Sequence, residues 1–157
     1  MKKIIMIGLI LSWSVFSYAG TKYISDCEFP YAFPGKPKIA TSYVGSVAVT
    51  QRYYYPSDNT MLRAECIPVG TITDTELVNI LRIQANATGI ESPTISIEST
   101  SYPRVGIYSG ERYVAGHKIR VHGEVLVGIE STLHLSVFEN ANIFPSKSVV
   151  NFLDSYK

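Results

Sequence analysis

The alternation of apolar and polar residues is clearest in residues 119–137, which read IRVHGEVLVGIESTLHLSV. Apolar residues recur at every second position on both sides of Gly128, as in two half-buried strands joined by a turn. If the turn centres on Gly128, residues whose numbers add to about 256 lie opposite each other. This stretch therefore predicts an antiparallel hairpin.

The same period of two continues elsewhere in the chain. It is visible within residues 95–114, and residues 39–55 and 61–69 form a second candidate hairpin around the turn residues 56–59. Residues 21–37 are rich in proline and aromatic residues, which favours an extended segment at an edge of the sheet. Together these patterns predict a largely antiparallel β-sheet.

Two segments have the period of a helix instead. Thr73 and Glu76 form a capping box at the start of the first, and Gly89 is placed to end it in the left-handed conformation. The second is expected after Ser146, near the end of the chain. We therefore predict an α+β fold, in which two amphipathic helices pack on one face of the largely antiparallel sheet.

The N-terminus has the three parts of a secretory signal peptide. Two lysines precede a 13-residue run of apolar or small residues, residues 4–16, and a small-residue cleavage site ends at Ala19. Because a helix that spans a membrane needs about 20 apolar residues, we expect cleavage rather than an uncleaved anchor. The chain is thus divided into a signal peptide, residues 1–19, and a single α+β domain, residues 20–157, that is periplasmic or secreted.

The charge of this domain argues against two classes of partner. The chain has 14 basic residues; without Lys2 and Lys3, 12 remain against 13 acidic residues, a net charge of −1. No basic cluster is available to bind a nucleic-acid backbone or an anionic membrane surface. We therefore expect no nucleic-acid partner and no stable membrane insertion after cleavage.

Cys27 and Cys66 are the two cysteines of the chain. Export would place them in an oxidising compartment, where a disulfide is the expected state and two separate buried thiols are the alternative. Two cysteines without further ligands nearby do not complete a zinc site.

Two short motifs resemble a known group of proteins. The loop FPGKP at residues 33–37 and the ending FLDSY at residues 152–156, with the hairpin and the amphipathic middle helix between them, look like small exported bacterial domains with a PsbP-like or DcrB-like fold. The resemblance spans nearly the whole chain after residue 20, and its motifs are structural. It implies a fold, and it carries over no catalytic residues.

The sequence lacks the motifs of the common enzyme classes. It contains no G-x-S-x-G or S-x-x-K pattern, no nucleotide-binding glycine-rich loop, no H-E-x-x-H pattern and no EF-hand loop. We therefore predict that the protein is not an enzyme, with no catalytic residues and no cofactor.

Two histidines form a candidate metal site. A hairpin that turns at Gly128 would place His122 opposite His134, on the face away from Val121 and Leu133. Two imidazoles at cross-strand distance, with Glu124 close by, can bind a transition metal. Ordinary surface or half-buried histidines are the alternative interpretation.

Four consecutive strand residues form a candidate interaction surface: Arg52, Tyr53, Tyr54 and Tyr55. Alternation along a strand directs Tyr53 and Tyr55 to one face and Arg52 and Tyr54 to the other, so at least one aromatic ring should reach the outer face. Tyrosine and arginine commonly anchor protein interfaces. The alternative is that these tyrosines wall a small core with their hydroxyl groups at its rim.

These observations lead to two functional hypotheses. The first is a non-enzymatic exported protein that binds an unknown protein partner in the envelope, as an accessory or immunity-type factor. The second is a protein that binds a small ligand or a transition metal, through the histidine pair or a pocket between helix and sheet.

Overall fold

The computed structural model describes residues 22–24, 26–44 and 46–157, so the predicted signal peptide, residues 1–19, lies outside the described residues. The elements, in chain order, are β1 (Lys22–Ile24), β2 (Tyr31–Phe33), β3 (Lys38–Val44), β4 (Val47–Ser57), β5 (Thr60–Ile67), α1 (Asp74–Ala87), β6 (Thr94–Ser99), β7 (Arg104–Val114), β8 (His117–Val127), β9 (Thr132–Asn140) and α2 (Lys147–Leu153).

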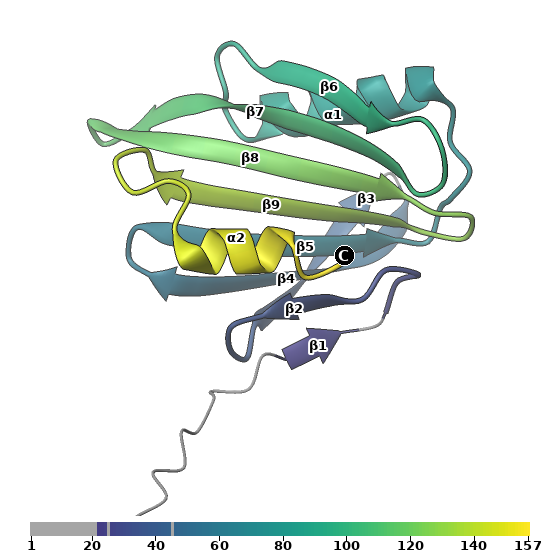
Figure 1. The fold of residues 1–157 in the computed structure, drawn as a ribbon, viewed down its shortest axis with the longest axis horizontal. Helices are drawn as coiled ribbons and strands as arrows, with labels where there is room; N and C mark the ends of the chain where they lie inside the picture. The colour runs from purple at the N-terminus through teal and green to yellow at the C-terminus, as the bar shows by residue number, and fades with distance from the viewer. Residues whose placement is uncertain (1–21, 25, 45) are drawn as a thin grey trace, which may run out of the picture.

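Seven strands form one antiparallel sheet in the order β3-β4-β5-β9-β8-β7-β6 (Figure 1). Strands β6 to β9 follow one another as a meander, and the earlier strands β3 to β5 join it where β5 pairs with β9. The predicted α+β class and largely antiparallel sheet are confirmed. The predicted strand over residues 39–55 is divided, because β3 and β4 pair with each other as a hairpin.

The two helices pack on opposite faces of this sheet, so the prediction that they share one face is wrong. Val121 and Val125 of β8 lie in the core with α1, whereas Leu126 lies in a second core with α2. Successive residues of a strand point to opposite faces. In Figure 1, α2 lies in front of the sheet and α1 behind it. The three consecutive buried residues Val125–Val127 already indicate a strand that is covered on both faces.

The helix ends follow the sequence prediction. Thr73 and Glu76 form the capping box of α1, and Gly89 follows the helix with a φ of 77°. Ser146 is the N-cap of α2, and its hydroxyl accepts a hydrogen bond from the Val149 N–H. Leu77, Leu81 and Ala85 are the buried side chains of α1.

The N-terminal segment does not extend the main sheet. Strands β1 and β2 form a separate two-stranded sheet, and Phe33 of β2 packs on Phe152 of α2 with 5.0 Å between ring centroids. A disulfide joins Cys27 to Cys66 of β5, as predicted, with 5.7 Å between the two Cα atoms. The bridge therefore holds this segment against the α2 side of the main sheet.

Candidate functional site

Helix α1 covers only part of its face of the sheet. It packs mainly on β6, β7 and β8, while the neighbouring strands β9, β5 and β4 carry partly exposed side chains on the same face. We call this region the open sheet face and define it by five residues: Tyr53, Tyr55, Met61, Arg63 and Phe138. Tyr55 is the most exposed of them, at 51 %.

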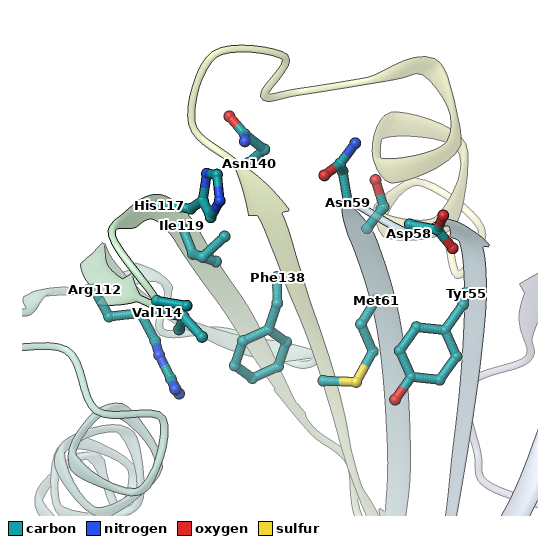
Figure 2. Close-up of a pocket in the computed structure, with 12 residues that line it drawn as sticks. Tyr55, Asp58, Asn59, Met61, Arg112, Val114, His117, Ile119, Phe138 and Asn140 are labelled. Carbon is teal, nitrogen blue, oxygen red and sulfur yellow. The ribbon is translucent and has the colours of Figure 1, made fainter.

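A cavity of about 480 Å³ lies at one end of the open sheet face. Figure 2 shows Val114, Phe138, Met61 and Tyr55 in a row across it, with His117, Asn140 and Asn59 toward the strand ends. A second hollow of about 370 Å³ shares Tyr55 and Met61 with the first and continues over Tyr53 and Arg63. The two hollows adjoin at these shared residues, and we call them together the transverse groove.

Two of the three cations beside the transverse groove lie against its aromatic rings. The Lys38 Nζ is 5.9 Å from the centroid of Tyr55, and the Arg63 Cζ is 5.6 Å from that of Phe138. Arg112 donates a hydrogen bond of 2.6 Å to the Thr88 carbonyl after the end of α1. The Arg63 Nε also donates a 2.9 Å hydrogen bond to the Ser136 hydroxyl. The partners in these four contacts are aromatic rings and neutral oxygens, which do not neutralise the positive charges.

A buried polar network runs beside the groove, among side chains on the α1 side of the sheet. The His134 Nε2 lies 2.9 Å from the Tyr108 hydroxyl, and its Nδ1 lies 3.5 Å from Glu65, whose other oxygen accepts a 2.7 Å hydrogen bond from Gln51. Burial lowers the pKa of His134, which favours the neutral imidazole, and burial raises the pKa of Tyr108 to about 12. The network satisfies polar groups inside the domain.

The contact between the Tyr108 side chain and His134 depends on a glycine in the strand between them. Tyr108 on β7 pairs with Gly123 on β8, and its ring crosses β8 to reach His134 on β9. A Cβ atom at Gly123 would lie 2.2 Å from the Tyr108 ring. Only glycine leaves room for this ring, which explains why an isolated glycine interrupts the most regular strand of the sequence.

The predicted opposition of His122 and His134 is wrong. In the structure His122 pairs with Val137, and His134 pairs with Val125, so the two imidazoles lie on opposite faces of the sheet. The paired numbers add to 122 + 137 = 259 instead of 256, because the turn takes four residues, 128–131. A shift by an odd number exchanges the faces. His122 instead lies 3.3 Å from Glu124.

Only half of the predicted interaction surface lies on the open sheet face. Tyr53 and Tyr55 lie there, with 5.9 Å between their ring centroids. Arg52 and Tyr54 point to the α2 side, where Arg52 forms an ion pair with Asp26 and Tyr54 packs on the core that contains Phe33. The alternation predicted for this strand is confirmed, and Arg52 and Tyr54 hold the N-terminal segment.

Met61, Phe138, Ile119 and Arg112 were not among the residues singled out in the sequence. Each occupies an ordinary alternate position of a strand, and nothing local distinguishes it from a core residue. Their exposure follows from the strands that α1 leaves uncovered, so no local sequence signal could have found them.

Among the described residues, no group of three or more His, Cys, Asp or Glu side chains is placed to hold a metal ion. No helix in the described part of the chain is both long and apolar enough to span a bilayer. No protein-family model matches the sequence, and no curated protein matches it either. The resemblance to PsbP-like and DcrB-like domains therefore stays a prediction.

Proposed function

We propose that the protein is exported and acts outside the cytoplasm by binding another protein through its open sheet face, without catalysis of its own. The signal-peptide pattern and the disulfide support export, because such bridges persist in oxidising compartments. Mass spectrometry of the exported protein should find Gly20 as the first residue. An intact Met1 would contradict the export part of the proposal.

The observation that carries the binding proposal is the incomplete cover of the sheet. The chain packs α1 on one part of this face and leaves tyrosine, methionine, phenylalanine and arginine side chains partly exposed on the rest. These residue types are enriched at protein interfaces, since they combine a large contact area with a polar group or a flexible chain. Exposed aromatic side chains that lie together are typical of an interaction site.

Site-specific photocrosslinking tests this proposal in cells that export the protein. A photoreactive residue in place of Tyr55 should yield a discrete crosslinked protein. The same residue at Ile83, which is 64 % exposed on α1, serves as the matched control and should not. With the purified partner, Tyr55→Ala should weaken binding at least about tenfold, the effect of losing an aromatic anchor. Equal crosslinking at both positions would refute the proposal.

A small ligand is the second candidate occupant. The cavity volume of about 480 Å³ lies within the range of roughly 300–1,000 Å³ that is typical of small-molecule sites. Native mass spectrometry of the protein purified from its own compartment distinguishes the two functions. A bound small molecule that Phe138→Ala releases would favour the ligand, whereas a mass of the chain alone would favour the protein partner.

A further inference from the structure

The shape of the transverse groove restricts what can occupy it. Its lining comes in spatial order from β7, β8, β9, β5 and β4, and neighbouring strands lie about 4.8 Å apart, so four spacings give a length of roughly 19 Å. Its floor is apolar, with Val114, Ile119, Phe138, Met61 and Tyr55 along its length. An occupant must therefore present an apolar stripe of about this length.

Basic side chains outnumber acidic ones around the groove. Lys38, Arg63 and Arg112 border it, and none of them forms an ion pair with a carboxylate among the described residues. Asp58 is the one acidic residue in the lining of either hollow. A complementary occupant therefore carries negative charge beside its apolar stripe.

The sheet itself favours a helical occupant over an extended one. An extended segment laid flat on an apolar sheet face would leave its backbone N–H and C=O groups without partners, because the strands below are already paired with each other. A helix satisfies its own backbone. At 1.5 Å per residue, about 13 helical residues span roughly 19 Å, and anchors at i, i+3 or i+4, and i+7 would meet the apolar floor.

We propose that the transverse groove binds an acidic amphipathic helix of the protein partner, an inference that rests on the proposed function. A second copy of this chain does not offer such a helix among its described elements. Leu77 and Leu81 bury the apolar side of α1 in the chain's own core, and Val149 and Phe152 do the same for α2. The carboxylates of the partner helix lie beside Lys38, Arg63 and Arg112.

Three synthetic 15-residue helical peptides test the inference directly on the oxidised domain. All three share one leucine and phenylalanine stripe, and their polar faces carry only glutamate, only lysine or only glutamine. Fluorescence anisotropy at low salt should show at least tenfold tighter binding of the glutamate peptide than of the lysine peptide. NMR shifts should centre on Tyr55, Met61 and Phe138.

Two variants give the charge control. Lys38→Gln/Arg112→Gln should reduce the preference for the glutamate peptide at least fivefold, whereas Lys147→Gln, which removes an exposed charge on α2, should leave it unchanged. Added salt should weaken the preference in the wild type, which checks the charge argument without a substitution. A glutamate peptide that binds no better than the lysine peptide, or that shifts residues away from the groove, overturns the inference.

The two proposals fail in different ways. A partner that crosslinks at residue 55 but contacts it through a neutral or basic segment leaves the proposed function standing and overturns the acidic helix. Tighter binding of vesicles that contain anionic phospholipid than of the glutamate peptide would also overturn it, in favour of a lipid surface. Loss of any position-specific crosslink at residue 55 overturns the proposed function itself.

Discussion

Glu28 joins the N-terminal segment to the turn between β8 and β9. Its carboxylate accepts hydrogen bonds from the backbone N–H groups of Ile129 at 3.1 Å and of Glu130 and Ser131 at 2.6 Å each. Desolvation raises the pKa of Glu28, but these bonds outweigh it and hold the pKa below the ordinary value of 4.5. One side chain, about 100 residues away in sequence, thus shapes the central turn.

Glu28→Gln should destabilise the domain at neutral pH, because the amide loses the charge that the three N–H groups stabilise. Since the folded pKa is the lower one, this stabilisation is fully present above the unfolded pKa and is lost as the pH falls through the folded pKa. Urea unfolding at pH 7, 5 and 3 should therefore show a difference between variant and wild type that shrinks toward acid.

Glu91→Gln is the matched control for this series. Glu91 is exposed, and its carboxylate forms no hydrogen bond or ion pair among the described residues. Its replacement should leave the unfolding midpoint nearly unchanged at each pH. A difference for Glu28→Gln that stays constant from pH 7 to pH 3 would contradict the proposed role of the charge.

Helix α1 is the element that local sequence specifies best. The Glu76 N–H donates to the Thr73 hydroxyl, and the Glu76 carboxylate accepts from the Thr73 N–H at 2.6 Å. Leu77, Leu81 and Ala85 form its buried face, whereas Ile83 is exposed. The capping residues set the two ends of the helix. The sheet below it determines which of its side chains are buried.

Thr73→Ala should cost about 1 kcal/mol of unfolding free energy, since it removes the side chain that accepts the Glu76 N–H. Thr75, exposed in the same first turn, is the control: Thr75→Ala should be neutral or slightly stabilising, because alanine has the better helix propensity. Chemical denaturation of both variants measures the difference. If the two lose equal stability, the capping box does not stabilise the helix.

At the scale of the whole molecule, the disulfide closes a loop between residues 39 positions apart. In the chain-entropy account, removing a bridge of this loop length costs about 4 kcal/mol. Cys27→Ser/Cys66→Ser should therefore unfold at a markedly lower urea concentration than the oxidised wild type. A reductant should lower the urea unfolding midpoint of the wild type toward that of the variant. It should leave the midpoint of the variant unchanged. Equal midpoints for oxidised and reduced protein would contradict this prediction.

The sequence by itself determined the helix and strand types, both helix starts and the turn around residues 56–59, and it predicted the Cys27–Cys66 pair that the structure contains. Each of these depends on side chains that are close in sequence or, for the cysteines, on a count that allows one pairing. The alternation of Tyr53 and Tyr55 with Arg52 and Tyr54 is predictable for the same local reason.

Only the tertiary structure decided the register of β8 on β9, the face that each helix covers and the groove that α1 leaves open. The register depends on a four-residue turn held by Glu28, and it moved His134 to the opposite face from His122. The groove collects Tyr55, Met61, Phe138 and Arg112 from four strands. Such features arise from contacts between distant residues, and periodicity along one strand contains no information about them.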